Sequence, residues 1–125
     1  MSERCPCGTG LLYDECCGRA HAGTPAATAE ALMRSRYSAF ALGDVDYINL
    51  TWHPDTRPAD LALDADQRWT HLEIVSTQGG GPFHAKGVVE FRAHYRQNRQ
   101  RGVLHERSQF VRDGGRWLYL DGVIA

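Results

Sequence analysis

Four cysteines crowd the first part of the chain and offer the most specific chemistry in the sequence. Cys5 and Cys7 are separated by one proline, eight residues follow, and Cys16 and Cys17 are adjacent. Four thiolates are a common tetrahedral ligand set for Zn²⁺ in structural sites. Such a closed site leaves no coordination position for a substrate. The spacing therefore predicts one structural zinc ion held by these four side chains.

The adjacent pair leaves the fourth ligand open. One thiol of Cys16 and Cys17 could remain free while His21 completes the site, and Cys17 is favoured over His21. Disulfides are a further alternative, although clustered cysteines in a reducing compartment are more often metal ligands. The chain has no C-x-x-C spacing, which argues against a redox pair.

A second group of residues with chemical potential lies near the end of the chain. Along the expected strand 103–112, Leu104, Glu106, Ser108 and Phe110 share one face, because side chains alternate along a strand. If the apolar members point inward, the carboxylate goes with them and needs a partner or a raised pKa. The remaining expected neighbours of this pocket are Arg36, Tyr37, Trp52, His53 and Tyr95.

Two roles are open for this carboxylate. Glu106 and His53 could act together as general acid and base on a small substrate. Alternatively, Glu106 is bonded to Arg34 or Arg36 from the first long helix, and His53 only caps a helix end. The sequence favours the second role. An open, partly polar cavity without an ion pair at Glu106 would support the enzyme instead.

The elements that must position these groups begin with two helices. Thr24 or Thr28 can cap a helix whose apolar residues recur at helical spacing until Gly43. Asp44 can cap a shorter helix that ends before residues 52–54, because a residue preceding proline avoids helical angles. A loop with one helical turn near residues 65–69 is expected next.

The second half of the chain alternates as strands do. Four strands are predicted, over residues 71–77, 83–96, 103–112 and 116–123. The turns between them contain glycine or polar residues. Trp117, Tyr119 and Asp121 share a face of the last strand. Trp52, Trp69 and Trp117 are expected in the core rather than around a cofactor. Helices followed by an antiparallel meander predict an α+β fold.

The totals exclude several classes of protein. A net charge of −1 gives no strong nucleic-acid signal, and no apolar run approaches the roughly 20 residues that a membrane helix needs. The first residues lack the apolar segment of a signal peptide. We therefore expect a cytoplasmic protein without membrane insertion. All cysteines lie in residues 1–23, which are expected to form a zinc knuckle before a domain over residues 24–125.

The cysteine segment carries a resemblance to a known family. The run Cys-Pro-Cys-Gly-Thr-Gly-x-x-Tyr-x-x-Cys-Cys-Gly over residues 5–18 closely resembles the SEC-C zinc motif. In that motif the cysteines matching Cys5, Cys7 and Cys16, and a Cys or His at the place of Cys17, bind zinc.

The resemblance extends over nearly the whole chain. Residues 28–40, 51–54 and 105–110 resemble the bacterial YchJ family. That family joins a SEC-C motif to a cone-shaped α+β domain similar to nuclear transport factor 2, and its longer members carry a second SEC-C motif after the domain. The family has no settled activity, so the resemblance implies the fold more than the function.

Two functions follow as hypotheses. In the first, the zinc knuckle presents a small surface to a protein partner, and the protein is an interaction or adaptor module. In the second, the cone cavity holds a small hydrolase, isomerase or dehydratase active site. The sequence favours the first. The open face of the sheet could also form a homodimer.

Overall fold

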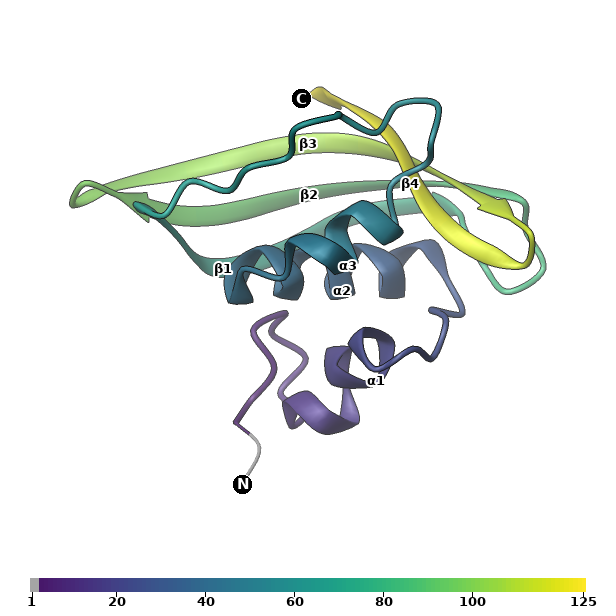
Figure 1. The fold of residues 1–125 in the computed structure, drawn as a ribbon, viewed down its shortest axis with the longest axis horizontal. Helices are drawn as coiled ribbons and strands as arrows, with labels where there is room; N and C mark the ends of the chain where they lie inside the picture. The colour runs from purple at the N-terminus through teal and green to yellow at the C-terminus, as the bar shows by residue number, and fades with distance from the viewer. Residues whose placement is uncertain (1–2) are drawn as a thin grey trace.

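The computed structural model describes residues 3–125 and arranges them in three layers. A curved antiparallel sheet forms one layer, α2 and α3 form the next, and the cysteine segment lies on the far side of α2 (Figure 1). The elements are the 3₁₀ helix η1 (Tyr13–Glu15), α1 (Cys17–His21), α2 (Ala29–Leu42), α3 (Val45–Leu50), β1 (Gln67–Gly79), β2 (Lys86–Gln97), β3 (Gln100–Asp113) and β4 (Arg116–Ile124). The strands pair in the order β1-β2-β3-β4, which confirms the α+β prediction.

The two predicted helices begin and end at the expected residues. The Thr28 side chain accepts a hydrogen bond from the Ala31 N–H at 3.0 Å, so Thr28 rather than Thr24 caps α2. Gly43 ends α2 in the left-handed conformation (φ +77°). The Asp44 carboxylate then accepts from the Tyr47 N–H at 3.1 Å and caps α3.

Most strand ends extend beyond the predicted bounds, furthest at the starts of β1 and β3. The helical turn expected near residues 65–69 is wrong, because β1 begins at Gln67 and pairs with the end of β2 from that residue on. The turn expected over residues 97–102 shortens to Asn98 and Arg99. Both have positive φ (51° and 69°), as two-residue hairpin turns of the mirror-image type require. The ladder therefore continues almost to the tip of the hairpin.

The start of the second predicted strand is also wrong. Phe83 is 98% exposed in the loop between β1 and β2, and β2 begins at Lys86. The Gly80 N–H donates to the Lys86 carbonyl at 2.9 Å and closes the ladder there. Apolar and polar residues alternate through this loop as they do along β2, which is why the sequence predicted a strand there. The loop residues 83–85 nevertheless do not pair with β1.

A bulge in β4 changes which residues share its inner face. Gln109 pairs with Asp121 and Phe110 with Tyr119, so Leu120 has no partner in the ladder. Trp117 and Tyr119 face the helices, and Trp117 is 2% exposed. Asp121 is exposed, so the prediction that it shares their face is wrong, because the extra residue reverses the alternation.

The core lies between the sheet and α2 and continues into the cysteine segment. Its buried members are Ala29, Leu32, Met33 and Tyr37 from α2, Leu72, Val89, Phe91, Ala93, Phe110 and Trp117 from the sheet, and Cys5, Cys7 and Cys17. Ser35, Ser38 and Arg36 of α2 are buried as well. One helix therefore contacts both the sheet and the cysteine segment.

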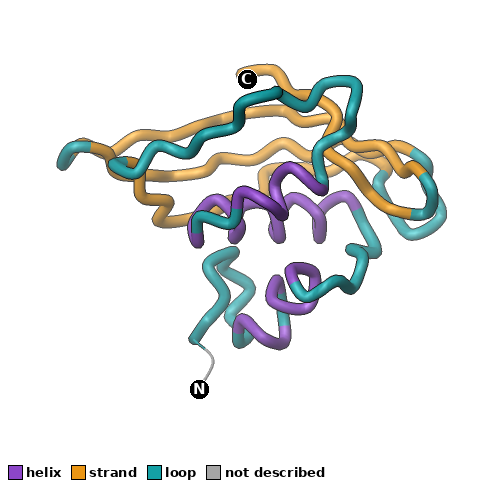
Figure 2. The backbone as a smooth tube through the Cα atoms, in the orientation of Figure 1, coloured by secondary structure: helices purple, strands orange, loops and turns teal. Residues whose placement is uncertain are grey.

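The segment between α3 and β1 runs along one side of the sheet (Figure 2). At its start, the His53 N–H donates to the Tyr119 carbonyl of β4 at 2.8 Å. Near its end, the Gln97 side-chain amide donates to the Asp64 carboxylate. The segment is thus fixed at both ends by the sheet. No helix within residues 3–125 is both long and apolar enough to cross a lipid bilayer.

Candidate functional site

A small hairpin brings the two cysteine pairs together. The Cys5 N–H donates to the Leu11 carbonyl at 2.9 Å, and an antiparallel bridge joins Arg4 and Leu12. The chain then passes through η1 into α1, where Cys16 is the N-cap residue and Cys17 the first residue of the helix. Gly18 permits this close return, because a Cβ at that position would lie 2.6 Å from the Tyr13 carbonyl oxygen.

The four sulfur atoms form a compact cluster. All of them lie within 4.8 Å of one another, and the Cys7 and Cys16 sulfurs are 3.6 Å apart. Four sulfurs at about 2.3 Å from a central zinc ion would be about 3.8 Å apart. Cys5, Cys7 and Cys17 are at most 5% exposed. The donor set and spacing therefore fit a tetrahedral metal ion.

Contacts among the thiols polarise the cluster. The Cys17 thiol donates to the Cys7 sulfur and lowers the pKa of Cys7 to about 4, against the opposing effect of burial. The same contact, together with burial, raises the pKa of Cys17. Burial also raises the pKa of Cys16. Several buried thiolates would repel one another, so they are stable together only with a cation among them. A bound metal ion supplies that cation.

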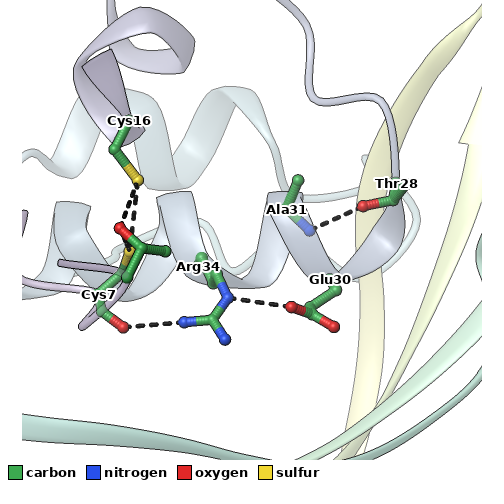
Figure 3. A network of polar contacts seen from close by, with 7 residues as sticks. Cys7, Cys16, Thr28, Glu30, Ala31 and Arg34 are labelled. Carbon is green, nitrogen blue, oxygen red and sulfur yellow. Dashed lines mark hydrogen bonds and ion pairs between the residues drawn. The ribbon is translucent and has the colours of Figure 1, made fainter. Parts of the chain in front are cut away.

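Helix α2 supports the cluster from behind. The Ser38 hydroxyl lies 3.5 Å from the Cys5 sulfur. The Arg34 guanidinium donates to the Cys7 carbonyl at 3.0 Å and to the Glu30 carboxylate at 3.1 Å (Figure 3). These contacts bring a positive charge near a centre whose four thiolates and one dication would carry a net charge of −2.

His21 is engaged elsewhere. Its Nε2 lies 2.8 Å from the Ser35 carbonyl oxygen, which can only accept, so Nε2 carries a proton. Its Nδ1 lies 2.6 Å from the Tyr13 hydroxyl. With both ring nitrogens occupied, His21 has no lone pair directed at the sulfurs. It joins α1 to α2 instead, and within residues 3–125 the group of possible metal ligands consists of the four cysteines.

A separate cavity of about 170 Å³ lies between the sheet and the helices. It is partly open to solvent, and most of its wall is apolar. Six of the residues expected around a pocket line it: Arg36, Tyr37, Trp52, Leu104, Glu106 and Ser108. The other lining residues are Met33, Phe40, Trp69, Phe91, Ala93 and Tyr119.

Glu106 is the acidic group of this cavity, and two hydroxyls hold it. Ser108 Oγ donates to Glu106 Oε1 at 2.8 Å, and the Tyr119 hydroxyl donates to the same oxygen at 3.0 Å. Burial and the nearby carboxylate raise the pKa of Tyr119, so it stays a donor at neutral pH. Tyr119 was not predicted as a pocket residue, although its alternation with Trp117 on β4 was a signal for it.

The arginines expected beside Glu106 bind other groups. Arg34 lies at the cysteine cluster. Arg36 donates to the Ile48 carbonyl at 2.9 Å and to the Thr51 hydroxyl at 2.7 Å. Within the described part of the chain, no ion pair joins Glu106 to a basic side chain. A hydroxyl network replaces the expected ion pair.

Two expected pocket residues lie outside the cavity. The His53 ring lies at the edge of β4, 3.7 Å from the Asp55 carboxylate and 3.8 Å from that of Asp113. The bond from its N–H to β4 fixes it there, away from Glu106. The Tyr95 ring packs against Trp69 with centroids 5.3 Å apart, so Trp69 takes the place at the cavity wall.

The outer face of the sheet is polar. Glu73 contacts Arg92 and His94, at 3.4 Å and 3.8 Å. Glu90 contacts His105 at 2.7 Å and Arg107 at 3.6 Å, and it is the more buried of the two carboxylates. These cross-strand pairs satisfy the charges within one chain. The homodimer through this face stays a prediction.

Fold and site together define a class: a small α+β protein with a four-cysteine knuckle beside a curved-sheet domain. Residues 1–19 match the model of the SEC-C motif, and residues 28–122 match that of the YchJ middle domain, which is described as similar to nuclear transport factor 2. The chain belongs to the YchJ family, and its cysteine segment is a SEC-C motif.

Relatives and solved structures agree with this assignment. A UPF0225 protein of Streptomyces coelicolor is 59% identical over 119 residues, which cover 94% of this chain and 93% of the relative. A UPF0225 protein of Bordetella pertussis is 50% identical over 124 residues, covering 96% and 92%. The solution structure of a SEC-C motif containing protein from Rhodopseudomonas palustris gives a TM-score of 0.85 at 36% identity, covering 98% of this chain and 99% of that one. A crystal structure of a SEC-C motif containing protein from Psychrobacter arcticus gives 0.79 at 31%, covering 98% and 83%.

Proposed function

We propose that the cysteine knuckle, residues 1–23, binds one Zn²⁺ ion whose role is structural. The observation that carries this proposal is the cluster of four sulfurs, three of them buried in a core shared with α2. A soft thiolate set suits zinc. Because all four coordination positions would be filled by the protein, the ion has no position left for a substrate and does no chemistry.

Elemental analysis of purified protein tests the metal and its amount. We expect about one zinc per chain in the wild type and almost none in the double variant Cys16→Ser/Cys17→Ser. Iron in place of zinc would contradict the identity of the metal. Zinc that persists in the double variant would contradict the site.

We further propose that the knuckle is the surface that contacts a protein partner, so that the protein is an interaction module. Leu11 supports this proposal. It is apolar and 49% exposed. The segment that contains it lies on the opposite side of α2 from the sheet (Figure 1). Clustered cysteines that act as metal ligands rather than as disulfides are typical of a reducing compartment, which supports a cytoplasmic location.

A photo-crosslinking side chain placed at position 11 in cells tests this contact, with position 103 as the control. Val103 is 50% exposed on the sheet, so it matches Leu11 in exposure but not in location. We expect one defined protein to be captured from position 11 only, and Leu11→Asp to abolish its binding without loss of zinc. Equal capture from both positions would contradict the interaction surface.

The second candidate function is an enzyme that acts on a small molecule in the cone cavity. The observation that favours it is Glu106, a carboxylate in a largely apolar cavity that forms no ion pair within the described residues. A screen of metabolites for turnover tests it. Activity that is lost in Glu106→Gln but kept in His105→Gln, on the opposite face of the same strand, would support a hydrolase, isomerase or dehydratase.

A further inference from the structure

We propose that the cone cavity binds an uncharged, ring-sized molecule whose polar end donates a hydrogen bond to Oε2 of Glu106. A phenol, an alcohol or an amide on a small ring has this chemistry. This inference shares its site, the cavity around Glu106, with the second candidate function. It does not require catalysis, because a ligand can bind there without being turned over.

The hydrogen bonds of Glu106 determine what it can accept. The hydroxyls of Ser108 and Tyr119 both donate to Oε1. Among residues 3–125, the hydrogen bonds to the Glu106 carboxylate both go to Oε1 and none goes to Oε2, and the side chain lines the cavity. An unused carboxylate oxygen in such a place is a strong acceptor for a ligand donor. The two hydroxyls also fix the carboxylate, so little freedom is lost when a ligand binds.

The sheet leaves room for this arrangement. Gly122 pairs with Ser108 on the inner face of β4, and a Cβ at position 122 would lie 1.8 Å from Glu106 Oε1. The bulge at Leu120 is what turns Gly122 to this face. The missing side chain and the bulge therefore together accommodate the carboxylate in its observed position.

The charges around the cavity favour an uncharged ligand. Arg36 is 3% exposed and packs against two rings that also contact each other, with its guanidinium carbon 5.1 Å from the Trp52 centroid and 4.6 Å from that of Tyr119. Burial lowers the pKa of Arg36 to about 10, so it keeps its charge at neutral pH. Arg36 and Glu106 offset each other in the cavity wall. A charged ligand would leave an uncompensated charge there.

The remaining wall sets the shape of the ligand. Met33, Phe40, Trp69, Phe91 and Leu104 surround the space with apolar and aromatic groups. A volume of about 170 Å³ suits a single ring rather than a large cofactor. An apolar ring against these side chains, with its donor at Glu106, satisfies both parts of the cavity.

The test compares p-cresol with toluene, which has the same ring and methyl group but no donor. Each probe is titrated into ¹⁵N-labelled zinc-bound protein, and the amide shifts are followed by NMR. We expect saturable shifts at Ala93, Leu104 and Ser108, with p-cresol on the order of tenfold tighter than toluene.

Three variants sharpen the test. Glu106→Gln should weaken p-cresol on the order of tenfold and leave toluene unchanged, because a neutral acceptor is weaker. Gly122→Ala should also weaken p-cresol by displacing the carboxylate, with the sheet retained. His105→Gln, on the outer face, should change neither. Glu106→Gln and Gly122→Ala change different residues, so either can serve if the other fails to fold.

The outcomes are distinct. Equal affinity for the two probes, shifts outside the cavity, or no saturable binding of p-cresol would overturn the inference. Turnover in the metabolite screen without a preference for donor ligands would overturn it too, while the enzyme would stand. Donor-dependent binding without any turnover would support the inference and count against the enzyme.

Discussion

The knuckle and the cone are stabilised in different ways although they share one helix. The knuckle has few apolar side chains and depends on four sulfurs and a small number of hydrogen bonds to α2. The cone depends on a continuous apolar core between α2 and the sheet. Helix α2 presents Ser35 and Ser38 to the knuckle and Met33 and Tyr37 to the cone. The comparison indicates that metal removal and core mutation should damage different parts of the molecule.

The largest expected effect comes from loss of the metal. Cys16→Ser/Cys17→Ser should unfold the knuckle, because zinc binding contributes about 10–16 kcal/mol in small zinc domains that lack a core of their own. Hydrogen exchange should show unprotected amides over residues 5–21 and retained protection in β2 and β3. Loss of protection in the whole sheet would show that the two regions are not separable.

A core mutation tests the other side of the comparison. Phe110→Ala should cost about 3–5 kcal/mol, because Phe110 is 1% exposed and leaves a cavity in the centre of the cone. Denaturant unfolding measures the loss. The folded variant should still bind one zinc per chain. A reduced zinc content in the folded variant would contradict the separate stabilisation of the knuckle.

A smaller effect is expected where the two regions are joined. His21→Ala removes the bonds to Tyr13 and Ser35 and should cost about 1–3 kcal/mol. The zinc content should stay at one per chain, whereas Cys17→Ala should lower it. This pair of variants distinguishes a histidine that connects α1 to α2 from a cysteine that binds the metal. Zinc loss in His21→Ala with zinc retained in Cys17→Ala would reverse the assignment.

The smallest expected effect is at the start of the shared helix. Thr28→Ala should cost about 1 kcal/mol, because it removes the side-chain oxygen that caps α2. Thr24→Ala is the matched control, since Thr24 was the other candidate cap and lies outside α2. Thermal unfolding should therefore separate the two variants. Equal losses in both would contradict the cap at Thr28.

Local signals made much of the fold predictable. The cap at Thr28, the end at Gly43 and the second cap at Asp44 are each set by one side chain and its immediate neighbours. The position of Glu106 and Ser108 on the inner face followed from alternation along β3. Features of this kind depend on a few residues of sequence, so the sequence alone indicates them.

The failed predictions involve residues distant in the sequence. The first residues of β1 become strand because β2 offers a partner 30 residues away. The bulge at Leu120 reverses the alternation of β4 and removes Asp121 from the inner face. His53 is placed by its bond to β4. Pairing partners and bulges are not contained in local periodicity, and for this reason the cavity wall was predicted only in part.

The central claim is that four cysteine sulfurs hold one zinc ion in the knuckle. X-ray absorption at the zinc edge of the purified protein tests it most directly, because it counts the ligand atoms and their distances. The account predicts four sulfur ligands at about 2.3 Å and no nitrogen ligand. A site with three sulfurs and one nitrogen at about 2.0 Å would contradict it and would return His21 to the metal.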